Sequence, residues 1–402
     1  MRTFRDRRSK LRVWSLAATA FLALAIPSLA VGSARNKTRP LAPATLHVVV
    51  FEPANGYFLT HNRLLDNGID VAADELNRRG GIGGKVRIAL ERIPFRATSR
   101  PARLMRAVPR GTEVAILPCN VDLAPSLAKA AAARHLLILS PCNPDPAATR
   151  RIPMDWPIAM SGNQEAAQLV DWALGERMVP AYLLVGEPKT SYVSALTRYF
   201  RAALTENHIP LVGEATVKLD GSNVSAVAKD IRRAKPLVIF TAVFSPYVEK
   251  IASGLRHRGV RAPVLVGDGM DAQLELQKYT WRDLSEVLFA SYGFARPASK
   301  AFFDEYRARF RRRPVGAFPG LGLETIRVLE AAVLRAGSTE PRAINDAFAQ
   351  GFKLTGVGLS DRVYPGSGVR EPTTDVGVSR VDAPPGLYYP YYSSIPRSVP
   401  RP

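Results

Sequence analysis

The sequence predicts an α/β protein with two doubly wound, Rossmann-like lobes, each built on a parallel sheet, and a hinged cleft between them. Three observations support this prediction. The folded region opens with a strand, a helix and a strand, which is how a parallel sheet begins. Short apolar strands then alternate with helices along the chain, as in sheets that are covered by helices on both faces. At 402 residues, the chain is long enough for two such lobes.

The opening unit spans residues 46–90. Residues 46–51 (LHVVVF) are typical of a buried strand. The following helix carries apolar residues at helical spacing, namely Leu65, Ile69, Ala72 and Leu76. Gly80 and Gly81 supply a left-handed exit from this helix. Residues 86–90 then alternate as a second strand.

Further helices regularly separate short apolar strands. The helices are expected at 101–108, 124–133, 165–174, 192–204, 222–233, 248–258, 299–310, 321–335 and 341–348. The strands are expected at 114–117, 136–139, 181–185, 211–217, 237–241, 264–266, 287–291, 362–364 and 374–381. Residues 156–162 are expected to cross between the lobes. The N-terminal lobe would then comprise residues 45–160 and 293–350, and the C-terminal lobe residues 161–292 and 351–381.

Residues 1–30 are typical of a signal peptide, which predicts export to the periplasm or the outer face of the cell envelope. A basic head precedes an apolar stretch that is interrupted by Pro27, and small residues precede a cleavage site near Ala30. An ordinary basic head is favoured over a twin-arginine signal, which Arg7-Arg8 resembles only faintly. Residues 31–44 are expected to form a flexible leader.

The C-terminal residues 382–402 are rich in Pro and Tyr. Two interpretations stay open for them: a loosely packed tail, or a segment that docks on the surface through its tyrosines. Those tyrosines are Tyr388, Tyr389, Tyr391 and Tyr392.

The chain is basic, with a formal net charge of +20. The basic head contributes +5 of this charge, so the mature chain keeps +15. Such a charge is compatible with nucleic acid or membrane binding. Export and the scattered placement of Arg, apart from Arg311-Arg312-Arg313, argue against nucleic acid. We therefore interpret the charge as a solvated surface that faces an anionic envelope.

One phrase in the opening unit resembles a known family. Residues 72–84 read A-x-D-E-x-N-x-x-G-G-I-x-G, which resembles the leucine-binding-protein family, the type I periplasmic solute-binding proteins of branched-chain amino acid ABC transporters. The similarity continues in order through residues 186–204, 254–272, 302–318 and 321–341. It implies a monomer that binds an amino acid or related amide between its lobes and delivers it to an ABC permease in the membrane, without a cofactor.

Two loops of the first lobe are ligand loops by this resemblance. The family places a small hydroxyl pair in one and S-P-x-A-T in the other, and both bind a ligand carboxylate. This chain has PCNVD at residues 118–122 and SPCNPD at residues 140–145, with Pro144 in place of the Thr. Proline has no N–H to donate, which puts the carboxylate site in doubt. The candidate ligand contacts of these loops are Cys119, Asn120, Cys142 and Asn143, and turn formation or helix capping is the alternative for both Asn residues.

The resemblance also suggests ligand residues in the second lobe. Asp268 is the candidate acid for a ligand ammonium group, with a plain turn Asp as the alternative. Phe244 would cover the ligand, or simply pack in the core. Asn163 and Gln164 would bind the ligand, or cap the helix at 165–174. Tyr192 is the last candidate, and packing is its alternative.

The two cysteines, Cys119 and Cys142, each follow a predicted strand. Neighbouring strands lie about 4.8 Å apart, which is close enough for a disulfide, and an exported chain meets oxidising conditions. We therefore predict a Cys119–Cys142 disulfide at the cleft rim. Two free thiols or a soft-metal pair are the alternatives. The five histidines show no ligand spacing, so no metal site is expected.

No enzymatic motif stands out. The sequence has no G-x-S-x-G, no P-loop and no G-x-G-x-x-G, so the chain is not expected to be an enzyme. Two alternatives to a transport role stay open. One is a ligand sensor of a signalling system, and the other is an envelope protein of the same fold whose ligand is lost or altered.

Overall fold

The computed structural model describes residues 41–402 except 121, 143–144, 273–275, 281, 294–295, 313, 315, 356–358, 368 and 382–387. The predicted signal peptide and most of the predicted leader lie outside the described residues. Among the residues that are described, no helix is both long enough and apolar enough to cross a membrane.

The first part of the described chain forms a five-stranded sheet with the order β2-β1-β3-β4-β5. Its paired strands run parallel. The strands are β1 (Ala44–Pro53), β2 (Val86–Phe95), β3 (Val114–Ile116), β4 (Leu137–Ser140) and β5 (Asp155–Pro157). Its helices are α1 (Leu59–Arg78), α2 (Pro101–Ala107), α3 (Ala124–Ala132), α4 (Pro146–Thr149), α9 (Lys300–Phe310), α10 (Phe318–Ala336) and α11 (Pro341–Ala349).

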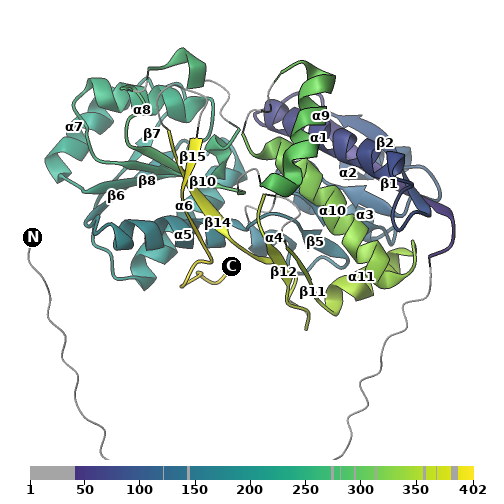
Figure 1. Cartoon of the computed structure of the whole chain (residues 1–402). Helices are drawn as coiled ribbons and strands as arrows, with labels where there is room; N and C mark the ends of the chain where they lie inside the picture. Colours follow the sequence, from purple (N-terminus) through teal and green to yellow (C-terminus); the bar gives the residue numbers. More distant parts are fainter. Residues whose placement is uncertain are drawn as a thin grey trace, which may run out of the picture. The chain divides into compact units, whose positions relative to one another are not determined.

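Alternate residues of β1 build two separate cores, one on each face of this sheet. Val48 and Val50 pack into the core that includes α1 and α10, and Val49 and Phe51 pack into the core that includes α2 and α3. Successive side chains of a strand point to opposite faces, so both faces of the sheet are buried. Figure 1 shows green α10 lying along purple α1.

A seven-stranded sheet follows in the order β15-β14-β10-β9-β8-β6-β7. Its strands are β6 (Ala181–Gly186), β7 (Leu211–Val217), β8 (Val238–Thr241), β9 (Val264–Val266), β10 (Val287–Ser291), β14 (Val376–Val381) and β15 (Tyr388–Ser394). Its helices are α5 (Gly162–Gly175), α6 (Ser191–Glu206), α7 (Val224–Ala234) and α8 (Tyr247–His257). Helix α5 packs with α6, and α7 packs with α8, on opposite sides of the strands in Figure 1.

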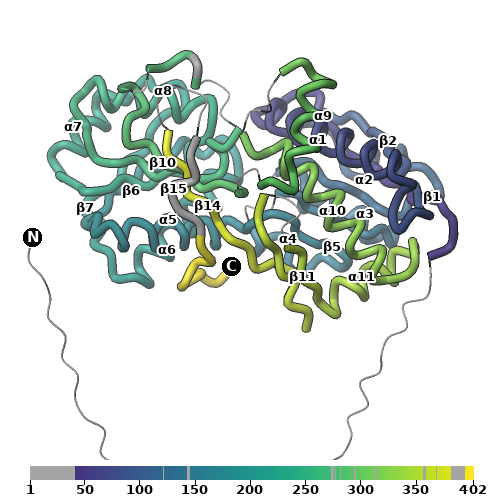
Figure 2. Tube along the Cα trace, viewed as in Figure 1, coloured from purple at the N-terminus to yellow at the C-terminus, as the bar shows by residue number. Residues whose placement is uncertain are grey.

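A small antiparallel sheet connects the late part of the chain to the crossover after β5. It consists of β11 (Phe352–Leu354), β12 (Arg362–Tyr364) and β13 (Thr373–Thr374). Arg362 Nε donates to the carbonyl of Ile158 at 2.6 Å, and the Tyr364 hydroxyl donates to the carbonyl of Pro157 at 2.9 Å. Figure 2 follows the yellow-green chain from β11 toward β14.

The α/β class and its mainly parallel strands are confirmed, and the predicted helices and strands are found with end shifts of a few residues. Three strands were not predicted. Residues 155–157 pair as β5, although residues 156–157 were expected to begin the crossover. Residues 352–354 form β11. The predicted Pro/Tyr-rich tail contributes β15 through main-chain pairing with β14. The last two strands are antiparallel, an arrangement that needs no crossover helix.

The predicted Gly-Gly exit from α1 is confirmed. Helix α1 ends at Arg78, and Gly80 and Gly81 have φ angles of +94° and +82°. A Cβ atom on Gly81 would lie 2.2 Å from the carbonyl oxygen of Val86, so no larger residue fits without movement of the chain. The N–H of Ile82 donates to that same carbonyl at 2.7 Å, which turns the chain directly into β2.

One buried carboxyl group in the five-stranded sheet makes the stability of the protein depend on pH. Asp155 is 1% exposed, and its Oδ1 accepts the Ser140 hydroxyl at 2.5 Å. Burial raises the pKa of Asp155 to about 7, although that hydrogen bond and the charge of Arg370 oppose the rise. In the unfolded chain the pKa is about 3.9.

We therefore expect Asp155→Asn to flatten the dependence of stability on pH. Between pH 4 and pH 7 the folded protein holds a proton that the unfolded chain releases, so the free energy of unfolding falls as pH rises, by at most about 4 kcal/mol. The variant has no proton to lose and keeps an acceptor for Ser140. Urea unfolding at pH 5 and pH 8 measures the effect. Equal losses of stability in the two proteins would contradict this explanation.

Candidate functional site

A cavity lies between elements of the two large sheets. Its volume, taken as the space open to the centre of a water molecule, is about 30 Å³, which is room for about two waters. It is lined by Phe58, His61, Cys119, Cys142, Tyr192, Asp268, Gly269, Tyr292 and Phe318. Among these residues, Cys119 follows β3, Cys142 follows β4 and Tyr292 follows β10. The carboxyl ends of parallel strands are where open α/β sheets bind ligands.

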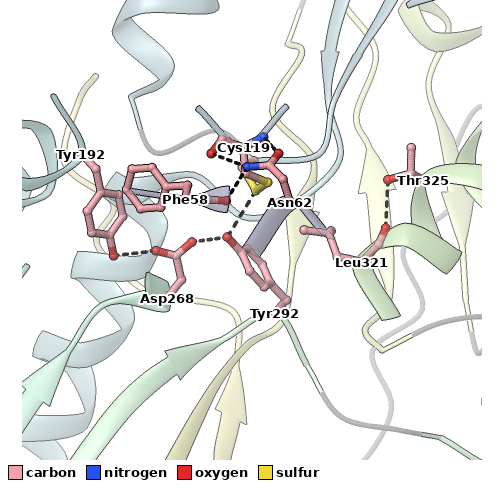
Figure 3. Close-up of a disulfide and its surroundings, with 9 residues drawn as sticks. Phe58, Asn62, Cys119, Tyr192, Asp268, Tyr292, Leu321 and Thr325 are labelled. Carbon is pink, nitrogen blue, oxygen red and sulfur yellow. Dashed lines mark hydrogen bonds between the residues drawn. A yellow bond between two sulfur atoms is a disulfide. The ribbon is translucent and has the colours of Figure 1, made fainter. Parts of the chain in front are cut away.

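The predicted Cys119–Cys142 disulfide is present, with the two Cα atoms 5.2 Å apart. It forms part of the cavity wall. Asn62 on α1 holds this wall in place: the Cys119 N–H donates to Asn62 Oδ1 at 2.8 Å, and Asn62 Nδ2 donates to the Cys119 carbonyl at 3.3 Å. Figure 3 shows both contacts beside the sulfur atoms. Asn62 had no sequence signal, since an Asn inside a helix is usually on the surface.

The loop after β3 uses its polar groups to form a turn. Asn120 Oδ1 accepts the N–H groups of Asp122 at 3.2 Å and Leu123 at 3.1 Å. The N–H of Asn120 itself donates to the Pro118 carbonyl at 2.8 Å. These bonds correspond to the turn-forming alternative for Asn120. Asn143, the candidate in the other loop, lies outside the described residues.

Asp268 is the centre of a hydrogen-bond network on the opposite wall. It lies in a short 3-10 helix, η1 (Asp268–Met270). Its Oδ1 accepts the hydroxyl of Tyr192 at 2.7 Å, and its Oδ2 accepts the hydroxyl of Tyr292. Figure 3 shows the carboxylate between these two hydroxyls. The Tyr192 oxygen also accepts the N–H of Gly269 at 3.0 Å, so the loop and the ring fix each other.

Two more buried carboxyl groups stand behind Asp268. The N–H of Asp268 donates to Glu165 Oε1 at 2.6 Å. Asp271 Oδ2 accepts the Ser291 hydroxyl at 2.8 Å and the Tyr292 N–H at 3.1 Å. Both acids are at most 2% exposed.

Burial raises the pKa of each of these three acids, but not equally. It raises the pKa of Glu165 well above its ordinary value, and the charge of Asp268 adds to this rise. It raises the pKa of Asp271 to about 8. It also raises the pKa of Asp268, but hydrogen bonds from Tyr292, Tyr192 and Glu165 oppose that rise. Asp268 is therefore the acid of this cluster that is best stabilised as a carboxylate.

Aromatic rings form much of the remaining wall. Phe58 precedes α1 and Phe318 begins α10. The predicted Phe244 does not line the cavity. Its ring packs behind the lining, with its centroid 4.9 Å from that of Phe58 and 5.9 Å from that of Tyr192. Phe244 therefore supports the wall from behind, which corresponds to the core-packing alternative.

The predicted Asn163 and Gln164 lie away from the cavity lining. Gln164 Oε1 accepts the N–H of Ser161 at 2.9 Å, which is part of a capping box at the start of α5. Gln164 Nε2 donates to the Pro372 carbonyl at 3.0 Å, and Asn163 Nδ2 donates to the Pro400 carbonyl at 2.9 Å. Gln164 therefore caps the helix and contacts the chain before β13, and Asn163 holds the C-terminal residues.

Five lining residues were missed by sequence reasoning, namely Phe58, His61, Gly269, Tyr292 and Phe318. His61 lies on the buried face of α1, where an apolar or aromatic residue usually marks core. Tyr292 directly follows β10, and its position at a strand end was an available signal. Within the described residues, no group of three or more His, Cys, Asp or Glu side chains is placed to hold a metal ion.

Two α/β sheets with a small cavity at their strand ends are the features of a solute-binding protein. The sequence bears this out. Residues 45–361 match the family model described as periplasmic binding protein, and the chain belongs to this family. It is a binding protein and not an enzyme.

Relatives agree with the predicted resemblance to leucine-binding proteins. The Leu/Ile/Val-binding protein BraC3 of Rhizobium johnstonii is 23% identical over 319 residues, which cover 78% of this chain and 86% of that protein. The branched-chain amino acid binding protein LivJ of Streptococcus pneumoniae was solved with isoleucine. Its structure matches this one with a TM-score of 0.71 at 17% sequence identity, over 88% of this chain and 99% of the LivJ chain.

A second solved structure has the same fold with a different kind of ligand. It is a solute-binding protein of an ABC transporter from Rhodopseudomonas palustris, solved with 3,4-dihydroxybenzoic acid. It matches this structure with a TM-score of 0.72 at 18% sequence identity, over 89% of this chain and 99% of the other chain. At these identities the likeness shows the fold, and the ligands of these proteins differ among themselves.

Proposed function

We propose that this protein is the exported solute-binding component of an ABC importer. It binds a small polar solute, an amino acid or a related amide, in the cavity and delivers it to a membrane permease. The observation that carries the proposal is the Asp268 carboxylate, which lines the cavity between two tyrosine hydroxyls. A buried acid with fixed hydrogen bonds is suited to an ammonium group. BraC3 is named as a Leu/Ile/Val-binding protein and LivJ was solved with isoleucine, which supports this solute class.

Binding by hinge closure follows from the contacts that cross the cavity. We propose that the two large sheets with their helices are the two lobes, with the boundaries predicted above. The N–H of Ser191 donates to Asp122 at 2.9 Å, and the Tyr199 hydroxyl donates to Asp145 at 2.8 Å. His61 Nε2 lies 3.3 Å from the Gly269 carbonyl. A cavity with room for about two waters does not hold an amino acid, so these contacts must open for entry.

The solute itself would stabilise the closed form. A ligand shifts a conformational equilibrium only by its different affinity for the two forms. A solute that touches Asp268 and the disulfide wall at once gains both sets of contacts only after closure. The closed monomer would then dock on the permease. Export through the predicted signal peptide places the protein on the side of the membrane where such solutes arrive.

A thermal-shift screen of the mature protein tests this proposal. The panel comprises amino acids, their amides, small carboxylates and polyamines. A solute that binds only the folded state must raise the melting temperature with dose, and we expect this for at least one amino acid or amide. If no member of the panel raises the melting temperature, the solute-binding proposal fails. The better explanation is then an envelope protein of this fold that has lost its ligand.

A further inference from the structure

We infer that the cavity selects solutes that carry an ammonium group and no free carboxylate, such as amines and amino-acid amides. This inference rests on the proposed solute-binding function and narrows its ligand class. Two observations carry it. The polar groups of the cavity wall accept hydrogen bonds and attract cations, and the described N–H donors of the loop after β3 already have partners.

The charged group in the wall is negative. Asp268 lines the cavity, and neither Lys nor Arg is among the described lining residues. Glu165 and Asp271 lie directly behind it, so no buried cation in this network balances the Asp268 carboxylate. A buried charge without a partner is strongly unfavourable. A cationic solute supplies the missing partner, and an anionic solute increases the imbalance.

The rings of the wall favour a cation as well. Phe58, Tyr192, Tyr292 and Phe318 all line the cavity. A cation near an aromatic face gains about 0.5–2 kcal/mol from the ring quadrupole, most of all when it is desolvated. Both tyrosine hydroxyls donate to Asp268, and Figure 3 marks these two hydrogen bonds with dashed lines. These hydroxyls therefore stabilise the carboxylate and are not available as donors to a solute anion.

His61 adds a second acceptor. It is 1% exposed, and burial lowers its pKa to about 4, so the ring is neutral. Its Nε2 lies 3.3 Å from the Gly269 carbonyl, which is an acceptor, and therefore Nε2 carries the proton. Nδ1 is then a bare acceptor, and it is buried without a hydrogen-bond partner in the described structure. An N–H of a solute would satisfy it.

The described part of the loop after β3 offers no free N–H donor to a carboxylate. The disulfide itself donates nothing, and the N–H groups of Cys119, Asn120, Asp122 and Leu123 all have partners within the chain. These partners lie on α1 and in the loop after β3, on the same side of the cavity, so opening of the cavity does not release them. A carboxylate held against this loop without donors loses several kcal/mol of hydration. The zwitterion is therefore disfavoured relative to its amide.

Isothermal titration calorimetry with matched solutes tests the inference on the mature protein at pH 7. For each of four side chains, namely those of Gly, Ala, Leu and Phe, the series comprises the amino acid, its amide, the decarboxylated amine and the deaminated acid. We expect an amide or an amine to bind at least tenfold more tightly than the matched amino acid, and no deaminated acid to bind.

Different failures have different meanings. An amino acid that binds as tightly as its amide would overturn the inference and leave the proposed function intact. Binding of deaminated acids alone would overturn both the inference and the proposed amino acid or amide ligand, while solute binding in the cavity would stand. If no member of the series binds, the inference and the proposed amino acid or amide ligand fail together.

The variant Asp268→Asn tests the same point in the protein. It keeps the shape of the side chain and removes its charge, so we expect amine and amide affinity to fall at least tenfold. Asp220→Asn is the matched control, since Asp220 is an exposed acid that accepts the Ser222 N–H at 2.8 Å in a turn before α7; its affinity should stay within twofold. Unchanged affinity in Asp268→Asn would overturn the inference.

Circular dichroism and the melting temperature check that Asp268→Asn is folded. If it does not fold, Phe58→Leu replaces it, because this change removes one aromatic face and leaves the acid network intact. We expect Phe58→Leu to weaken amine binding at least threefold. Equal amine affinity in Phe58→Leu and the native protein would show that the aromatic rings of the wall do not favour a cation, and would overturn the inference.

Discussion

Arg362→Met is expected to lower the free energy of unfolding by about 3–5 kcal/mol. Arg362 on β12 and Glu324 on α10 form an ion pair in which both side chains are 1% exposed. Glu324 Oε1 also accepts the N–H groups of Leu359 at 2.6 Å and Ser360 at 3.0 Å, and Arg362 reaches the crossover at Ile158. Removal of the guanidinium leaves a carboxylate buried without its partner, which costs more than the pair itself contributes.

Chemical unfolding followed by circular dichroism measures this loss. The matched control is Arg307→Met on α9, where Arg307 pairs with Asp304 at 2.6 Å but is 52% exposed. An exposed pair contributes about 0–1 kcal/mol, so the control should unfold almost as the native protein does. Similar losses in the two variants would show that burial of the Arg362 pair is not what matters.

A double variant separates the unpaired charge from the lost packing. Arg362→Met combined with Glu324→Gln leaves no buried charge, and the Gln oxygen still accepts the N–H groups of Leu359 and Ser360. We expect the double variant to recover at least about 1 kcal/mol over Arg362→Met alone. If the second substitution destabilises the protein further, the cost lies in packing and hydrogen bonds, and our electrostatic explanation is wrong.

Reduction of the Cys119–Cys142 disulfide is expected to destabilise the protein by about 3 kcal/mol. The two cysteines are 23 residues apart in sequence, and a closed loop of this length restricts the unfolded chain by about that amount. The melting temperature with and without a reductant measures the effect. The control is the double variant Cys119→Ser/Cys142→Ser, which should melt lower and be insensitive to the reductant.

Thiol quantification under denaturing, non-reducing conditions checks the bond directly. We expect no free thiol per chain. Two thiols per chain in the exported protein would contradict the disulfide. A native protein that melts at the same temperature in reductant would show instead that the bond forms but contributes nothing to stability.

The sequence was sufficient for most elements of the fold. The opening strand, helix and strand were predicted because their periodicities are local, and the Gly80-Gly81 exit was predicted because few other residues tolerate its backbone angles. The Cys119–Cys142 bond was predictable for a related reason. Each cysteine follows a strand, and consecutive strands of a parallel unit are usually neighbours.

The missed strands are those whose pairing is not local. β5 has only three residues, one of which is Pro157, so its sequence shows no strand pattern. β15 lies in a segment rich in Pro and Tyr, and it becomes a strand because β14 offers an unpaired edge. The small sheet around β12 likewise forms because Arg362 and Tyr364 reach across to the crossover.

The sequence by itself determined the class of fold, the family, the disulfide and two residues of the cavity wall, Tyr192 and Asp268, whose roles toward a solute stay predictions. Only the tertiary structure decided that the wall is completed by Phe58, His61, Gly269, Tyr292 and Phe318. It also decided that Asn163 holds the chain's end at Pro400 and that Gln164 contacts Pro372 instead. The physical reason is distance along the chain. Helices, strands and turns follow from residues a few positions apart, whereas a cavity depends on side chains from segments up to about 260 residues apart, which meet only when the helices and sheets pack together.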